Sequence, residues 1–182
     1  MQRSPSVSAI RLSGPGRFPA TIGACLRWIL WLACAGLVLA GCQTVHKGLT
    51  PAQIAVLKQE GFKQTEEGWE LGLSDKVLFD FDAYVIKPEA GQNLQRLTGN
   101  LLRVGLDRMR LDGHTDNVGA ADYNQQLSLR RAQAVADVVK AAGMPAANIQ
   151  VRGLGATRPV ADNGSAAGRA ENRRVAIVIT VE

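Results

Sequence analysis

Apolar residues recur every three or four positions in two long segments of the chain, which predicts two amphipathic helices. The first is expected from Pro88 to Gly105, with its apolar stripe at Leu94, Leu97, Leu101 and Leu102. The second is expected from Ser128 to Gly143. A third, shorter helix is predicted from Thr50 to Gly61, because Thr50-Pro51-Ala52-Gln53 is a capping box with proline at the first helical position.

Alternating or continuous apolar runs predict strands between these helices. Phe62 to Leu73 has the pattern of a hairpin that turns near Glu67-Gly68. Further strands are expected at Val77–Phe81, Arg108–Gly113, Asn148–Arg152 and Val175–Val181. The last of these is apolar on both faces, as is typical of a central strand. Gly153 to Arg169, rich in Gly, Ala and Asn, is expected to be a long loop.

The order of these elements predicts the fold class. From Lys76 onward it is strand, helix, strand, helix, strand, strand, which favours an α+β two-layer sandwich with the helices on one face of a mixed sheet. We expect this main domain to span residues 76–182. The helix and hairpin of residues 50–75 would then form a separate segment that regulates or spaces it.

The N-terminal residues 1–41 have the pattern of a signal peptide. A basic stretch closes at Arg27, and the uncharged run Trp28–Leu39 is shorter than the roughly 20 residues that a membrane-spanning helix needs. Leu39-Ala40-Gly41-Cys42 resembles a bacterial lipobox, which implies cleavage before Cys42, lipidation of Cys42, and a tether over residues 42–49. The residue after Cys42 is Gln43 rather than Asp. By the usual sorting rule for lipoproteins, this favours delivery to the periplasmic face of the outer membrane. An uncleaved anchor with an incidental cysteine is the alternative.

Removal of this segment changes the charge and the cysteine content. The net charge of +5 includes four arginines before Cys42, and the remaining chain has 17 basic against 16 acidic residues. This balance gives no support for nucleic-acid binding. Cys25 and Cys34 leave with the signal peptide and Cys42 carries lipid, so the mature chain is expected to depend on its apolar core rather than on a disulfide.

The segment from Asp116 to Arg131 carries the candidate chemistry. A carboxylate at the exit of a strand and a guanidinium near the start of the next helix are suited to a zwitterionic ligand. Arg131 falls beside the apolar sector of the helix, where a buried cation needs an anion. Its position in a first helical turn would add an unfavourable interaction with the helix dipole. The anion is either a ligand carboxylate or a salt-bridge partner, Asp116 or Asp112.

A family resemblance narrows these alternatives. Gly113-His114-Thr115-Asp116-x-x-Gly119, followed by Asn124-x-x-Leu127-Ser128-x-x-Arg131-Ala132, resembles the motif of OmpA-like (OmpA/MotB/Pal) peptidoglycan-binding domains. Asn172-Arg173-Arg174-Val175 is similar to that family's entry into its final strand. The resemblance implies that Asp116 binds the amine, and Arg131 the carboxylate, of the diaminopimelate in the stem peptide. The residues that it implies for the pocket walls are Asn124, Leu127, Thr115 and Gly119.

Other stretches resemble one group within this family, outer-membrane lipoproteins that capture a small periplasmic repressor and so release a diguanylate cyclase. These stretches are Gly61-Phe62, Glu67-Gly68-Trp69, Lys76–Phe79, Ala142–Asn148 and Pro159–Asn163. The resemblance implies a partner-binding region that includes Ile54, Leu57, Phe62 and Trp69. The alternatives are that this region only packs on the sheet, and that the protein is a Pal-like tether whose partner is the Tol system.

Catalysis is not expected. His46 and His114 are the only histidines in the sequence, which excludes a site built from several histidine ligands. Ser128, His114 and Asp116 could be drawn as a triad, but their expected positions give no reason for the three to converge. Gly153-Leu154-Gly155 lacks dinucleotide-binding spacing. The sequence therefore predicts a binding protein without metal or cofactor.

Overall fold

The computed structural model describes residues 48–79 and 84–180. They belong to a compact unit that spans His46–Glu182. The predicted signal peptide, Cys42 and most of the tether over residues 42–49 lie outside the described residues, as does part of the predicted strand Val77–Phe81. Within the described residues, no helix is both long and apolar enough to cross a membrane.

Five strands form one mixed sheet in the order β1-β2-β5-β3-β4. Their bounds are β1 Lys63–Thr65, β2 Gly68–Ser74, β3 Met109–Gly113, β4 Ile149–Gly153 and β5 Arg174–Ile179. Strands β3 and β4 pair in parallel, whereas β1–β2, β2–β5 and β3–β5 are antiparallel. The strand expected to be central, β5, lies in the middle of the sheet, and its residues 175–179 are all buried.

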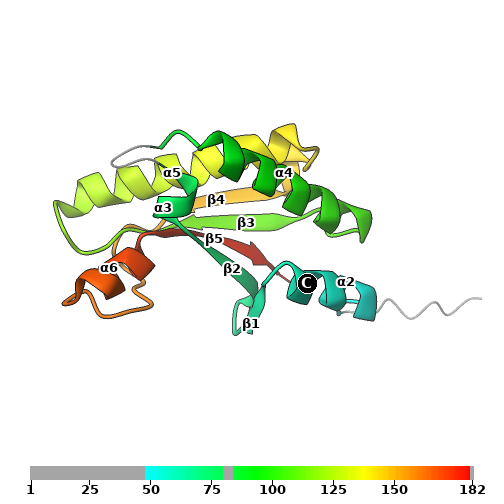
Figure 1. Ribbon diagram of the computed structural model, residues 1–182, viewed down its shortest axis with the longest axis horizontal. Coiled ribbons are helices and arrows are strands. Elements are labelled where there is room, and N and C mark those ends of the chain that lie inside the picture. Colours follow the sequence, from blue (N-terminus) through cyan, green and yellow to red (C-terminus); the bar gives the residue numbers. More distant parts are fainter. Residues whose placement is uncertain (1–47, 80–83, 181–182) are drawn as a thin grey trace, which may run out of the picture. The chain divides into compact units, whose positions relative to one another are not determined.

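The helices are α2 Pro51–Gln59, α3 Asp75–Leu78, α4 Pro88–Arg103, α5 Ala121–Ala141 and α6 Ala166–Asn172, with a short 3-10 turn at Ala146–Asn148. Helices α4 and α5 lie along one face of the sheet (Figure 1). The core fills the space between this helical layer and the sheet. Its largest fully buried side chains include Leu101, Leu111, Val135, Val139 and Ile177. The predicted α+β two-layer sandwich with a mixed sheet is confirmed.

Several elements form where the sequence pattern places them. The capping box of α2 is complete, with hydrogen bonds between the side chains and backbone N–H groups of Thr50 and Gln53 in both directions. Helix α4 buries Leu94, Leu97 and Leu101 as expected. The hairpin forms as β1 and β2, joined across Glu66 and Glu67. In these segments the local pattern and the packing agree.

The predicted start of the second long helix at Ser128 is wrong. Helix α5 begins seven residues earlier, at Ala121, and Ala120 is its N-cap without a side-chain hydrogen bond. The hydroxyl of Ser128 donates to the carbonyl of Gln125 within the helix, so it does not cap. Arg131 is therefore in the interior of α5, and the expected interaction with the positive end of the helix dipole does not apply.

The segment Val77–Phe81 was expected to be a strand, but Asp75–Leu78 is the short helix α3, and Phe79 makes an isolated bridge with Ile86. A brief apolar run fits a strand or a helical turn equally well, and here β2 already occupies the place beside β5. The predicted loop Gly153–Arg169 is also partly wrong, because α6 begins at Ala166. The hydroxyl of Ser165 accepts from the N–H of Gly168 at its start.

The hairpin expected to precede the main domain is part of its sheet. Strand β2 pairs with β5 along six residue pairs, from Trp69–Ile179 to Ser74–Arg174. Leu57, Phe62 and Trp69, expected to meet a partner, are buried in the core, and Ile54 packs against it. No boundary between compact units falls at Lys76. These side chains are accessible to a partner only if the segment separates from the sheet.

Candidate functional site

A pocket of about 490 Å³ lies where α3, the start of β5 and the first half of α5 meet. Five of the six residues implied for ligand binding line it, namely Thr115, Asp116, Asn124, Leu127 and Arg131. Three of them come from α5, and two follow β3 directly along the chain. The fold therefore brings together Asp116 and Arg131, which are fifteen positions apart in the sequence.

Asp116 is held in place by bonds to both carboxylate oxygens. Its Oδ1 accepts a hydrogen bond from the backbone N–H of Val118 at 3.0 Å, which closes a tight turn. Its Oδ2 accepts from the Arg173 guanidinium at 2.7 Å. This bond raises the pKa of Arg173 above its ordinary value. Each carboxylate oxygen has a further lone pair, so Asp116 can still accept from a ligand amine.

Arg173 links two carboxylates across the pocket. Besides Asp116, its Nε donates to Asp75 at the start of α3, with a distance of 3.0 Å to Oδ2. The backbone N–H of Asp75 also donates to the carbonyl of Arg173. The first turn after β2 is thus tied to the turn that holds Asp116, although the two are far apart in sequence.

Arg131 is 5% exposed, and its guanidinium lies over the ring of Phe79, 5.4 Å from the centroid. Its Nη1 is 3.7 Å from Asp75 Oδ2, which is a longer ion pair than the 3.0 Å one between Arg173 and the same oxygen. The two salt bridges considered from the sequence are not formed, because Asp116 pairs with Arg173 and Asp112 pairs with Arg110 and Arg152. The aromatic face and the carboxylate hold the guanidinium plane at the pocket wall.

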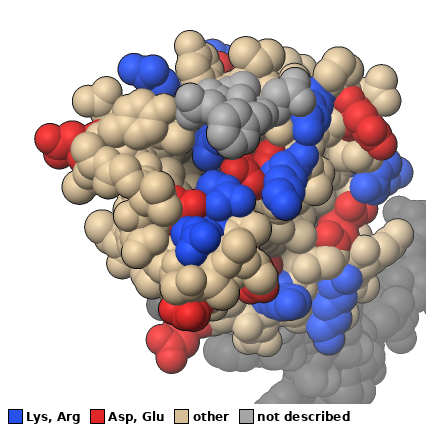
Figure 2. Space-filling view, turned by 60° about the vertical axis from the view of Figure 1, so that its left-hand side comes forward, with Lys and Arg blue, Asp and Glu red and all other residues tan. Residues whose placement is uncertain are grey.

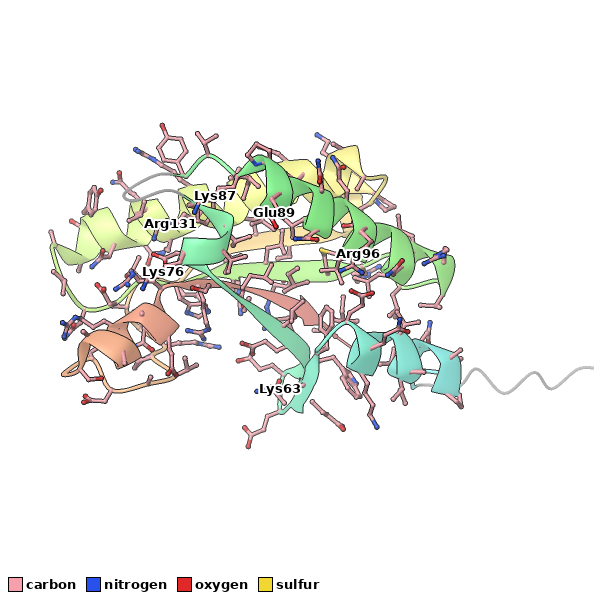
Figure 3. All side chains as sticks on the ribbon, viewed as in Figure 1. Lys63, Lys76, Lys87, Glu89, Arg96 and Arg131 are labelled. Carbon is pink, nitrogen blue, oxygen red and sulfur yellow. The ribbon has the colours of Figure 1, made fainter. Side chains whose placement is uncertain are left out.

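The pocket has an excess of positive charge among its described lining residues. The described lining includes four basic residues, Lys76, Lys87, Arg131 and Arg173, and two acidic ones, Asp75 and Asp116. Lys76, Lys87 and Arg131 come from different segments and lie near α3 in Figure 3. In Figure 2 basic and acidic side chains are intermingled on the face that carries this region. Such a pocket suits a ligand with one amine and more than one carboxylate.

Two buried oxygen atoms in the pocket wall have no hydrogen-bond partner among the described residues. They are Oδ1 of Asp75 and Oγ1 of Thr115. A buried polar atom left unpaired destabilises a protein, so such atoms commonly belong to sites where a ligand or water supplies the partner. Their position in the charged pocket, rather than elsewhere in the core, is consistent with a ligand site.

The other implied residues shape the pocket. The Asn124 amide donates to the carbonyls of Val118 and Asp116, at 2.9 and 3.4 Å, and fixes the turn against α5. Leu127 supplies apolar wall. Gly119 is not among the lining residues. It adopts a left-handed φ of 95° in the turn before α5, so its role in the structure is to shape the backbone.

Sequence reasoning did not assign a role in the site to seven further lining residues: Asp75, Lys76, Phe79, Lys87, Val118, Tyr123 and Arg173. Arg173 lay within the motif Asn172-Arg173-Arg174-Val175, which was interpreted only as the entry into the last strand. Asp75 carried no such signal, because its importance depends on the pairing of β2 with β5. Among the described residues no group of three or more His, Cys, Asp or Glu side chains could hold a metal ion.

The fold is that of a known class. Residues 78–173 match the OmpA family model, and the chain belongs to the OmpA family. It is similar to the peptidoglycan-associated lipoprotein from Burkholderia pseudomallei, with 32% identity, a TM-score of 0.51, and coverage of 56% of this chain and 86% of that one. It is also similar to the cell wall anchor of the type VI secretion system from Pseudomonas aeruginosa, with 30% identity, a TM-score of 0.60, and coverage of 75% and 99%.

Similarity to one curated relative extends over most of the chain. The outer-membrane lipoprotein YfiB of Pseudomonas aeruginosa is 53% identical over 158 residues, which are 85% of this chain and 94% of the relative. The family resemblance based on the Asp116–Arg131 motif is thereby confirmed. The localisation expected from Cys42 and Gln43 is confirmed as well: the chain is an outer-membrane lipoprotein of the OmpA family.

Proposed function

We propose that this lipoprotein binds peptidoglycan non-covalently, without catalysis, and that the diaminopimelate side chain of the stem peptide occupies the pocket at Asp116 and Arg131. One observation carries the proposal. A fixed carboxylate and a fixed guanidinium line one pocket of about 490 Å³, and the other charged residues of its described lining are three cations and one carboxylate. In this assignment Asp116 accepts from the ligand amine, and Arg131 donates two parallel hydrogen bonds to the ligand carboxylate.

The assignment is tested by removing each charge while a polar side chain is kept at the position. Asp116→Asn keeps an oxygen for the Val118 N–H, and Arg131→Gln keeps a polar side chain against Phe79. Lys140→Gln, on the exposed last turn of α5, is the matched control. Each site variant is expected to weaken binding to purified sacculi about 10- to 100-fold, the effect of one charge-assisted hydrogen bond. Unaltered sacculus binding by both site variants would refute the assignment.

A matched pair of ligands tests the chemistry independently. A stem peptide with lysine in place of diaminopimelate keeps the side-chain amine but lacks the side-chain carboxylate. It is expected to compete poorly with sacculi for the wild-type protein. Arg131→Gln is expected to bind the two stem peptides with similar affinity, because the residue that distinguishes them is gone. A wild-type protein that does not distinguish the two peptides would contradict the role of Arg131.

We also infer that the protein holds a small periplasmic repressor, similar to YfiR, and thereby activates a diguanylate cyclase in cyclic-di-GMP signalling. The similarity to YfiB over most of the chain supports this proposal. The family match begins at residue 78, and the chain has a helix and a hairpin before it. The presence of this additional segment also supports the proposal. The alternative is a Pal-like tether between outer membrane and wall that partners Tol components.

Capture from periplasmic extract separates these two functions. The exposed Ala55 of α2 lies in the proposed partner-binding region, and Ala55→Arg alters its surface without entering the core. Gln133→Arg, on an exposed position of α5, is the control. Co-elution of one small soluble repressor, lost in Ala55→Arg only, would support the signalling function. Recovery of Tol components instead, with or without sacculi, would support the tether.

A further inference from the structure

A second, smaller pocket borders the charged one. It has a volume of about 60 Å³ and is lined by Tyr84, Tyr123, Gln126, Leu127 and Arg130. Tyr123 and Leu127 line both pockets. The small pocket is therefore a side extension of the proposed diaminopimelate site, and a ligand can reach from one into the other without leaving the surface.

The helical periodicity of α5 explains why the pockets are adjacent. Tyr123, Gln126, Leu127 and Arg130 are spaced by three and four residues, so they share one stripe of the helix. Asn124 and Arg131, which line the charged pocket, are each one residue further along and form the neighbouring stripe. Helix α5 thus contributes one stripe of side chains to each pocket, and Tyr123 and Leu127 lie between the two.

The small pocket combines exposed aromatic surface with planar hydrogen-bonding groups. Tyr84 and Tyr123 are 49% and 52% exposed. The Arg130 guanidinium lies over the Tyr84 ring, 5.8 Å from its centroid, which favours one orientation of that ring. Exposed apolar surface beside a polar pocket is typical of a binding site. In the small pocket, the Arg130 guanidinium and the Gln126 amide line the wall beside the tyrosine rings.

We propose that this pocket is a subsite for a sugar ring of the glycan strand. A pyranose ring has a flat face of C–H groups and a rim of hydroxyl groups. The tyrosine rings match the C–H face, and Gln126 and Arg130 match the hydroxyl rim. This inference rests on the proposed function, because the stem peptide in the larger pocket is covalently joined to the glycan. Two residues separate its diaminopimelate from the sugar, a span of roughly 10 Å.

Binding of two defined wall fragments to the non-lipidated mature chain, Cys42→Ser, tests the subsite by calorimetry. One fragment is the free stem tripeptide, and the other is the same tripeptide on its disaccharide. The disaccharide form is expected to bind the wild-type chain about three- to tenfold more tightly, the range of one aromatic stacking contact. Tyr84→Ala is expected to remove this advantage and to leave the affinity for the free tripeptide unchanged. Tyr84→Phe, which keeps the ring, is expected to retain it.

Other outcomes would overturn the inference. Equal affinity of the wild-type chain for the two fragments would show that the sugar makes no contact. Equal loss for both fragments in Tyr84→Ala would place Tyr84 in the peptide site or in the fold. In both cases binding of the tripeptide itself would leave the proposed function intact. Failure of the wild-type chain to bind either fragment would overturn the proposed function together with the subsite.

Discussion

His114 is expected to make the stability of the fold depend on pH between 7 and 5. The side chain is 4% exposed and its Nδ1 is buried without a hydrogen-bond partner among the described residues. Burial, and then the nearby positive charge of Arg174, lower the pKa of His114 from 6.5 to about 4. Because the folded state resists protonation, the unfolded state binds more protons in this range, and stability is lost as pH falls below 6.5.

The size of the effect follows from the two pKa values. With 6.5 in the unfolded chain and about 4 in the folded one, the free energy of unfolding is expected to fall by about 2 kcal/mol between pH 7 and pH 5. Burial raises the pKa values of Asp112 and Glu67, but their arginine partners outweigh it and hold both below the ordinary values of 3.8 and 4.5. Their contribution to stability is therefore lost only at lower pH, as pH falls below these ordinary values.

Urea unfolding of residues 49–182 measures this loss directly. His114 is the only histidine in that range, so its pKa can be followed in the same protein by NMR. His114→Gln has no titrating group and is expected to lose little stability between pH 7 and pH 5. If the wild type and His114→Gln lose the same stability over this interval, or if His114 titrates near 6.5 in the folded protein, the reasoning fails.

Two glycine substitutions are expected to act in opposite directions. A Cβ atom on Gly113 would lie 1.9 Å from the carbonyl oxygen of Ser128, so Gly113→Ala is expected to cost at least about 3 kcal/mol and to broaden or abolish the cooperative unfolding transition. A Cβ atom on Gly99, within α4, would meet no atom within 4 Å, and Gly99→Ala is expected to stabilise the fold by about 0.5–1 kcal/mol. Denaturant midpoints check both, and a stable Gly113→Ala protein would contradict the close approach of β3 and α5.

Much of the fold could be predicted because its signals are local. The capping box at Thr50 requires only four consecutive residues, and the stripe of α4 requires only the helical period. The start of α5 could not be found in this way. Ala120 supplies no capping side chain, and the helix is stabilised there by packing and by the Asn124 amide bonds to the preceding turn. Where a helix begins without a side-chain cap, local sequence carries little signal.

By itself, the sequence supplied the ligand chemistry that we propose for the site. Asp116 and Arg131 are residue types that bind an amine and a carboxylate, and the spacing between them marks the family. Only the tertiary structure decided what surrounds them. Pairing of β2 with β5 brings Asp75 to Arg173, and pairing of β3 with β5 brings Arg173 to Asp116, although these residues are far apart along the chain. The β2–β5 pairing also buries Trp69 in the core. Such contacts join distant segments through the sheet, and no local pattern of residues encodes them.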